Sequence, residues 1–542
     1  MLTKTERSRV KGFLKTQGTK IINGNQEEII LTGWGLGNWL LCEGYMWKAH
    51  GISRFDRPRR MEKVILELTN SEYADYFWKT FRENYITRED IKKMAELGYN
   101  SVRIPFNWRL FMEDETEIIW KSEGFELLDR VIDWCEEFKL YAFLDMHGAP
   151  GGQTGSNIDD SIDNIPRLFM DTNFWHKAIE LWKALAHRYK DRWIVGGYDL
   201  LNEPIRPQDP NHEGCYDHLL PKLVEFYEAA ITAIRQIDSN HLFSIEGHHW
   251  ASSTSIFFKH YDENMVIHFH RYACLPDISC YKEFLELSNK WNIPLWLGES
   301  GENFTEWFTA MYPLAVSLGI SYNLWPWKKM DCTNSPYSIS MPKDWSLFLN
   351  YIKDKKSLDF ETSKLILDNY LESIKLENCT YNEEVHDAVL RQPGCHIRAT
   401  DFDELPGKGI SYSGLRHEKN PYNYRLNTFM QIEPKDFIKR ERRFSFDCLW
   451  DYLVLTLITD EFACYSLYNI KSGASISIDF LAIKPSVFTL YQDDILLKTW
   501  KTCASSKYQR TQYIPIHESL HSIFKIQVKS GSIHFDSLYT RK

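Results

Sequence analysis

Two short apolar stretches of the chain each end in a glutamate. Residues 194–200 form an apolar run that leads into the tripeptide Asn-Glu-Pro, with Glu203 and Pro204. Proline cannot donate a hydrogen bond to a sheet, so Pro204 predicts the end of a strand and leaves the glutamate at its carboxyl end. Residues 294–301 repeat the pattern with Glu299. An isolated Asn-Glu-Pro would equally fit a turn or a helix cap, but two such carboxylates need a common explanation, because an unpaired buried charge is costly.

Stretches of strand type alternate with helical patterns through the first two thirds of the chain. Several intervening segments carry apolar residues at i, i+3 and i+4, the spacing of one helix face. This alternation predicts an α/β fold, a (β/α)₈ TIM barrel, whose functional groups gather at the carboxyl ends of the strands. The predicted strands are residues 29–34, 101–105, 141–146, 198–201, 242–246, 265–269, 295–298 and 321–325, and the predicted helices include 88–97, 125–138, 174–189 and 219–237.

The region after the first predicted strand is too long for a simple loop. Residues 44–87 contain a helical run that starts at Met61, and they are predicted to form an insertion over the barrel mouth. The basic cluster from Arg54 to Arg60 is interpreted as a solvated surface. A long helical pattern over residues 343–376 is expected to close the barrel, so that the first domain covers residues 1–378.

Beyond the barrel the sequence pattern changes. The polar segment 377–387 is predicted to be a linker. From about residue 395 the chain consists of short alternating strands with Gly and Ser between them, as in residues 475–480, and no long helix is evident. This pattern predicts a second domain over residues 388–542, an all-β sandwich of the jelly-roll type.

Composition narrows the possible partners and location. The net charge of −10 argues against nucleic acid or an anionic membrane as the partner. No apolar run approaches the length of a membrane span, and the first nine residues are charged and lack a signal-peptide core, so a cytoplasmic location is expected. The 11 cysteines have no zinc-type spacing, which favours free thiols; no metal or cofactor is expected. The 15% of aromatic residues fits a carbohydrate ligand.

The two glutamates are the groups that hydrolysis of a glycosidic bond requires. In this hypothesis Glu299 attacks the anomeric carbon, while Glu203 protonates the leaving oxygen and later activates water. Arg103, in the predicted strand Val-Arg-Ile-Pro, would keep Glu299 ionised. A salt bridge at the barrel mouth would explain the same arginine.

Other residues at the predicted strand ends are candidates for contacts with the sugar. His147 and His270 are expected to hold hydroxyl groups and to orient the carboxylates. Asn202 would bind the hydroxyl next to the reacting carbon, and Trp325 would stack against the sugar ring. A purely structural role remains the alternative for each histidine and for the tryptophan.

The order of these motifs from residue 32 to residue 328 resembles the family 5 glycoside hydrolases. The resemblance is carried in order by Val-Arg-Ile-Pro, Asp-Met-His-Gly, Asn-Glu-Pro, His-x-Tyr, Gly-Glu-Ser and a late Trp. It implies a retaining enzyme with Glu203 as acid/base and Glu299 as nucleophile. It also implies a surrounding set of residues, which are Arg103, His147, Asn202, His270, Tyr272 and Trp325.

Two longer segments are similar to exo-β-1,3-glucanase and β-glucosidase members of that family. Residues 35–43 and 147–155 carry this similarity. It implies that Glu43 binds the terminal sugar in a closed pocket and that Trp39, in the same segment, also contacts the substrate. An ion pair of Glu43 with an arginine of the insertion is the alternative.

Departures from that pattern leave the substrate open. Asn38 replaces a glycine, Gly44-Tyr45 replaces Pro-Trp, and the insertion is unfamiliar. The expected function is a retaining exo-acting β-glycosidase that hydrolyses β-glucosidic bonds. The alternatives are a β-mannosidase, a glucosylceramide-type or diglycoside-specific glycosidase, or an endo-β-glucanase. A non-enzymatic sugar-binding protein is disfavoured because both glutamates are present.

The second domain is weakly similar to carbohydrate-binding modules of families 6 and 35. The similarity lies in residues 396–403, 461–467, 475–480 and 533–538. A sandwich that only supports the barrel is the favoured alternative.

Overall fold

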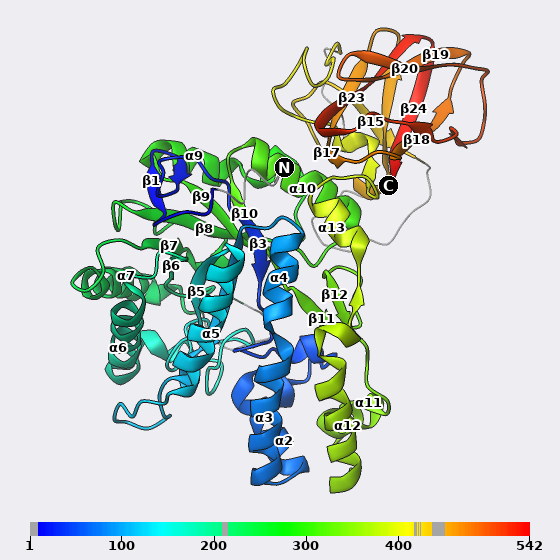
Figure 1. Cartoon of the computed structure of the whole chain (residues 1–542). Helices are drawn as coiled ribbons and strands as arrows, with labels where there is room; N and C mark the ends of the chain where they lie inside the picture. The colour runs from blue at the N-terminus through cyan, green and yellow to red at the C-terminus, as the bar shows by residue number, and fades with distance from the viewer. Residues whose placement is uncertain (1–8, 209–214, 417–419, 421, 423, 436–449) are drawn as a thin grey trace.

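The computed structural model describes residues 9–208, 215–416, 420, 422, 424–435 and 450–542 (Figure 1). Residues 1–8, which make up nearly all of the charged N-terminal segment considered above, lie outside these ranges. Among the helices that the structure describes, none is long and apolar enough to cross a bilayer.

Eight parallel strands close into a barrel, as predicted. The strand order around it is β10-β3-β4-β5-β6-β7-β8-β9, so each strand pairs with its neighbours in the sequence and β10 pairs with β3. Nearly every residue of these strands is buried, which explains their near-continuous apolar runs. The strands are β3 Thr32–Gly35, β4 Ser101–Asn107, β5 Tyr141–Gly148, β6 Val195–Asp199, β7 Leu242–Glu246, β8 Met265–Arg271, β9 Leu295–Ser300 and β10 Ser321–Leu324.

Amphipathic helices cover the outside of the barrel. They are α4 Arg88–Glu96, α5 Glu123–Phe138, α6 Thr172–Tyr189, α7 Leu220–Arg235, α9 Lys282–Trp291 and α10 Thr305–Ser317. The alternation is incomplete at one point, because only the single turn α8, His248–Ala251, follows β7 before β8 begins. Its backbone is left-handed from His249 to Ala251, which prevents a regular helix there.

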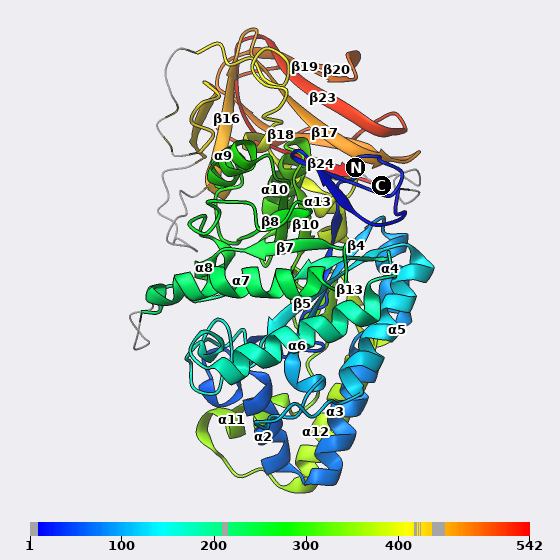
Figure 2. The ribbon, with the colours of Figure 1, turned by 90° about the vertical axis from the view of Figure 1, so that its left-hand side faces the viewer.

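The insertion forms η1 Gly44–Trp47, η2 Ser53–Phe55, α2 Pro58–Leu68 and α3 Ser71–Tyr85. It packs against α11, Trp345–Asp354, and α12, Phe360–Ser373, at the end of the molecule away from the sandwich (Figures 1 and 2). Aromatic rings fill this contact, with the Trp47 ring centroid 4.4 Å from that of Tyr370 and 6.1 Å from that of Trp345. The single barrel-closing helix predicted over residues 343–376 is therefore wrong. Two helices form, and they cover the insertion.

The segment predicted as a linker is structured. Residues 377–387 contribute β13, Thr380–Tyr381, and most of α13, Glu383–Val389, which packs against α10. Val385, Ala388 and Val389 are buried. These apolar residues alternate with polar ones at helical spacing, so the polar composition concealed a helix that belongs to the barrel. Short strands β11, Lys328–Met330, and β12, Tyr337–Ile339, pair with each other, and β12 also pairs with β13.

The C-terminal part is a β-sandwich, as predicted. One sheet has the order β15-β16-β24-β18-β21, with β14 paired to β24 and β22 to β18, and the other has the order β17-β23-β19-β20. All these pairings are antiparallel. The bounds are β14 His396–Arg398, β15 Gln431–Pro434, β16 Leu453–Ile458, β17 Phe462–Ile470, β18 Ser475–Ala482, β19 Ser486–Gln492, β20 Ile495–Thr502, β21 Gln509–Arg510, β22 Ile514–Pro515, β23 Ser519–Ser530 and β24 Ser532–Arg541.

The sandwich contacts the barrel at α10 and at the loop after β8. His396 Nδ1 lies 3.1 Å from a carboxylate oxygen of Glu306 in α10. The backbone N–H of Arg425 donates to Asp277 in the β8–α9 loop at 3.0 Å. The second domain thus supports a loop that begins at the carboxyl end of a barrel strand.

The basic cluster of the insertion is not a solvated surface. Arg57 is only 2% exposed, and its guanidinium donates to both carboxylate oxygens of Asp56, to the Ser161 hydroxyl and to the Asn164 side chain. The backbone N–H of Arg59 donates to the Asp160 carboxylate, and its guanidinium donates to the Asp160 carbonyl. These arginines therefore fasten the insertion to the β5–α6 loop.

Removal of this buried guanidinium is expected to destabilise the barrel. Arg57→Ala removes the donor of the Ser161 and Asn164 side-chain oxygens and leaves Asp56 with Arg60 alone. The free energy of unfolding is expected to fall by about 2–4 kcal/mol, which denaturant titration followed by fluorescence would measure. Arg167→Ala is the control, because Arg167 pairs with Asp163 on the surface, where both side chains are about 40% exposed. The free energy of unfolding of Arg167→Ala is expected to fall by less than about 1 kcal/mol. Equal effects of the two variants would contradict a buried network.

Candidate active site

A cavity of about 610 Å³ opens at the carboxyl ends of the barrel strands. Both glutamates predicted to be catalytic line it, and most of the other predicted contact residues join them. The lining residues include Glu43, Tyr45, His147, Asn202, Glu203, Trp250, His270, Tyr272, Glu299 and Trp325.

A fully buried arginine organises the base of this cavity. Arg103, in β4, donates from Nη1 to Glu299 Oε2 at 2.6 Å, from Nη2 to Asn202 Oδ1 at 2.8 Å and from Nε to Asp199 Oδ2 at 2.8 Å. The guanidinium is planar and has five fixed donors, so it sets the relative positions of side chains from the ends of two further strands, β6 and β9. The predicted contact between Arg103 and Glu299 is present.

Glu299 has two strong donors. Besides Arg103, the hydroxyl of Tyr272 donates to Glu299 Oε1 at 2.7 Å. Burial raises the pKa of Glu299, while Arg103, His147 and the Tyr272 hydrogen bond act in the opposite direction. Both carboxylate oxygens are therefore held in place, and the charged form is the one that these donors stabilise.

The two glutamates lie close to each other. One carboxylate oxygen of Glu203 and one of Glu299 are within 4.8 Å. Retaining glycosidases have carboxyl groups about 5–5.5 Å apart, whereas inverting enzymes need about 6.5–9.5 Å to fit a water between carboxylate and sugar. The short separation fits the retaining geometry.

The backbone of Glu203 has an uncommon conformation with φ of 42°. Its N–H donates to Glu246 Oε2 at 2.6 Å, and its carbonyl accepts from the Thr154 hydroxyl at 2.7 Å. Gln153 Nε2 donates to the neighbouring carbonyl of Asn202 at 2.9 Å. A non-glycine residue with positive φ persists only where its surroundings enforce it, and here these three side chains do so.

A chain of hydrogen bonds runs from Glu203 into the barrel through two histidines. His270 Nδ1 lies 2.6 Å from Glu203 Oε1, and His270 Nε2 lies 3.0 Å from His268 Nε2. The other nitrogen of His268, Nδ1, faces carboxylate oxygens of Asp199 at 3.0 Å and of Glu246 at 3.2 Å.

The carboxylates at the inner end of this chain determine where its protons lie. Burial lowers the pKa of both His268 and His270, so both imidazoles are neutral. Burial works against ionisation of Asp199, but His268 and Arg103 outweigh it and lower the pKa of this carboxyl group. His268 therefore carries its proton on Nδ1, toward Asp199, and its Nε2 accepts from His270 Nε2. His270 Nδ1 is then an acceptor, which requires a proton on Glu203.

The electrostatics of Glu203 agree with the assignment of a proton to its carboxyl group. Burial, and then the nearby charge of Glu299, raise the pKa of Glu203 well above the usual range. A carboxyl group that stays protonated near neutral pH can act as a general acid.

Asn202, His147 and Trp325 form one wall of the cavity. Asn202 Nδ2 lies 3.2 Å from His147 Nε2, and His147 Nδ1 lies 2.7 Å from Asp145. The ring of Trp325 stacks on His147 with a 5.2 Å centroid distance and an angle of 2°. A methyl group at Gly37 would meet this indole at 2.7 Å, so only glycine fits there.

Glu43 lies in the same cavity, as the resemblance implied. It is 2% exposed, and its pKa is raised well above the usual range by burial and by the charges of Glu299, Glu302 and Glu203. The alternative pairing with an insertion arginine does not occur. Arg54 pairs with Glu67 and Arg57 with Asp56.

Two expectations about the cavity wall are wrong. The indole of Trp39 does not line this cavity, because it points toward α3 and donates to the Arg82 carbonyl at 2.8 Å. The insertion also contributes less than expected, since Tyr45 is its one residue in the cavity lining. The remaining wall comes from the loops after β5, β7, β8 and β9, including Asn157, Trp250 and Ala273.

Sequence reasoning missed the inner polar layer of the site. Asp145, Asp199, Glu246 and His268 all touch Arg103 or the histidine chain and are fully buried. Each is a charged or ionisable residue inside an otherwise apolar strand, which is the signal that could have revealed them.

The comparisons with known proteins agree with this geometry. Residues 62–331 match the cellulase family, which is glycosyl hydrolase family 5. The chain contains a family 5 domain. Over 245 residues it is 33% identical to a protein named beta-xylosidase from Phanerodontia chrysosporium, covering 45% of this chain and 48% of that protein.

Other relatives carry other names. The chain is 30% identical over 200 residues to endoglucanase C of Acetivibrio thermocellus, covering 36% of this chain and 53% of the relative. It is 28% identical over 220 residues to a probable glucan 1,3-beta-glucosidase A of Aspergillus clavatus, covering 40% of this chain and 49% of the relative. The chain spans about half the length of these curated relatives, so they support the family 5 barrel and leave the substrate to experiment. The matched residues of the family end before the sandwich, for which sugar binding stays an untested alternative to a supporting role.

The histidine chain makes His268 a positioning residue whose loss is expected to change a pH profile. His268→Asn removes the acceptor for His270 Nε2, so His270 can carry its proton on Nδ1 and donate it to ionised Glu203, which lowers the pKa of Glu203. The acid form is lost as pH rises, so the basic limb of kcat/KM is expected to move to lower pH. Above that limb, kcat/KM for a poor leaving group is expected to fall by about 10²-fold.

Ser244→Ala is the matched control for this variant. Ser244 contacts the same His268 nitrogen at 2.8 Å but is not part of the path to Glu203. The basic limb of the kcat/KM profile of Ser244→Ala is expected to stay at the wild-type pH. A uniform loss of activity in His268→Asn, with an unmoved limb, would show that His268 only fills space.

Proposed function

We propose that the protein is a retaining, exo-acting β-glycosidase that hydrolyses terminal β-glucosidic bonds. The observation that carries the proposal is the pair Glu203 and Glu299, with oxygens within 4.8 Å and opposite protonation states favoured by their neighbours. The family 5 match supports the reaction class.

In the first step Glu299 attacks the anomeric carbon and the bond to the leaving oxygen breaks. Arg103 and Tyr272 fix the attacking carboxylate, so little reorganisation is needed at the moment of reaction. Glu203 transfers its proton to the leaving oxygen, and a glycosyl ester of Glu299 remains.

In the second step the ester is hydrolysed. Glu203, now ionised, takes a proton from a water that attacks the anomeric carbon, and the carboxylate of Glu299 is released. This restores the proton on Glu203 and its hydrogen bond to His270. Two displacements at one carbon retain the β configuration.

The exo mode rests on Glu43. Its buried carboxylate faces the same cavity as the catalytic pair, and it lies beside Tyr45 and Glu302 in the lining. A carboxyl group there can hydrogen-bond two hydroxyls of one terminal sugar. A continuing polysaccharide would occupy the same space.

An endo-β-glucanase is the second candidate, and the similarity to endoglucanase C of Acetivibrio thermocellus favours it. The beta-xylosidase relative likewise keeps β-xylosides open as substrates. Turnover of aryl β-glucosides, β-xylosides and β-mannosides, together with the product lengths from a β-glucan, separates these possibilities.

Alanine variants of the two glutamates test the assigned roles. Glu299→Ala is expected to lose turnover and to regain it with azide, which attacks from the vacated side and gives a glycosyl azide of inverted configuration. Glu203→Ala is expected to remain active only on substrates whose leaving groups need no proton. Product configuration by NMR is the measurement, and the reverse pattern would exchange the two roles.

Removal of the pocket carboxylate tests the exo mode. Glu43→Ala loses hydrogen bonds to the terminal sugar worth about 1–3 kcal/mol in total, so kcat/KM is expected to fall about 10–100-fold without loss of folding. Glu302→Ala, which removes another carboxylate of the lining, is the comparison. Long oligosaccharide products from a polymer, or a fully efficient Glu43→Ala enzyme, would contradict an exo-acting pocket.

A further inference from the structure

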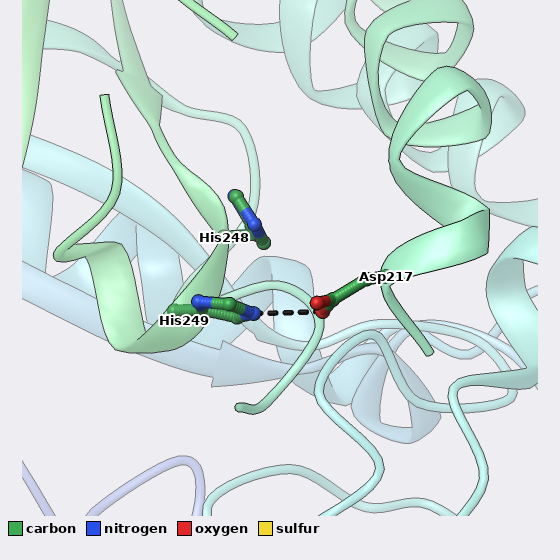
Figure 3. A group of neighbouring side chains, drawn as sticks. All are labelled: Asp217, His248 and His249. Carbon is green, nitrogen blue, oxygen red and sulfur yellow. Dashed lines mark hydrogen bonds and ion pairs between the residues drawn. The ribbon is translucent and has the colours of Figure 1, made fainter. Parts of the chain in front are cut away.

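A second group of ionisable side chains lies outside the catalytic centre. Asp217 comes from η5, Asp217–Leu219, while His248 and His249 come from α8 after β7. Figure 3 shows the three side chains converging from two separate loops. One donor atom of each lies within 4.8 Å of the others, and His249 Nε2 is 2.7 Å from Asp217 Oδ1.

The local backbone brings the two consecutive histidines together. His249, Trp250 and Ala251 all have positive φ, at 56°, 62° and 52°. As a result the rings of His248 and His249 are only 3.9 Å apart, instead of pointing to opposite sides as in a strand. The same turn places Trp250 and Ser252 in the wall of the substrate cavity.

The donor atoms are those that zinc prefers. Two imidazole nitrogens and a carboxylate oxygen supply three ligands. The thiol of Cys215 interacts with the Asp217 carboxylate but lies outside this group, and it is a fourth donor near the site. Zinc sites of this kind are usually four-coordinate with nitrogen, sulfur and oxygen ligands.

Further contacts prepare individual ligands. Ser255 Oγ contacts His248 Nδ1 at 3.3 Å, so the Nε2 side of that ring is left for an ion. Among the described residues, the other clusters of this type include Glu203 or Glu246 and belong to the catalytic network.

We propose that Asp217, His248, His249 and Cys215 bind a divalent cation of the zinc class. The ion replaces the hydrogen bond between His249 and Asp217 with two coordination bonds. The thiol proton passes to solvent, and His249 carries its proton on Nδ1 so that Nε2 binds the ion. The site joins the β6–α7 loop to the turn that carries Trp250, and so it holds one wall of the substrate cavity without taking part in bond cleavage.

Metal titration tests the proposal without any activity measurement. Full-length protein freed of metal with a chelator is titrated with Zn²⁺ by calorimetry, and one site per chain is expected. Asp217→Asn and His248→Gln are expected to weaken binding by about 10–100-fold or more. His218→Gln is the matched control, because His218 lies in the same η5 but outside the cluster, and its affinity is expected to equal that of the wild type.

Cobalt gives a readout of the ligand set. Co²⁺ at a tetrahedral site with a thiolate has intense visible and near-ultraviolet bands, and Cys215→Ser is expected to remove the thiolate band. The proposal is overturned if the wild type binds no Zn²⁺, if Asp217→Asn and His248→Gln bind as tightly as His218→Gln, or if Cys215→Ser leaves the Co²⁺ spectrum unchanged. None of these results depends on the glycosidase assignment, so the two proposals can fail separately.

Discussion

The buried guanidinium of Arg103 is the interaction on which the site depends. It faces Asp145, Asp199, Glu246 and Glu299 at 2.6–3.1 Å, all inside the barrel. One positive charge cannot compensate four buried negative charges, so some of these groups hold protons. Burial raises the pKa of Asp145 to about 8 and that of Glu246 well above its usual range, whereas Asp199 is shifted downward. His268 and Arg103 together thus favour the ionised form of Asp199 over those of Asp145 and Glu246.

That selection extends to the acid/base glutamate. Ionised Asp199 fixes the tautomer of His268, which fixes that of His270 and leaves the proton on Glu203. Glu246 also holds the Glu203 backbone in its left-handed conformation. Position and protonation of the general acid therefore have a common origin in the layer beneath the cavity, and a change in that layer acts on catalysis without touching the sugar.

The cavity wall depends on contacts that are remote from this layer. The loop that contains Tyr272 continues to Asp277, which accepts from Arg425 of the sandwich. The turn that contains Trp250 contacts η5 through His249. The two halves of the wall are thus supported from different parts of the molecule, and the sandwich has a structural role whether or not it binds sugar.

The sequence by itself determined the barrel, the sandwich and the pair of glutamates that we propose to be catalytic. Strand and helix periodicity reports local burial, and a carboxylate at the end of an apolar strand stands out within a few residues of chain. The sequence could not place Trp39, α13 or the helices over residues 345–373, because an amphipathic pattern does not show which surface its apolar face packs against. Only closure of the barrel brought Asp145, Asp199, Glu246 and His268 around Arg103. Strand register and neighbour order make those contacts, and neither is encoded in the local pattern of any one strand.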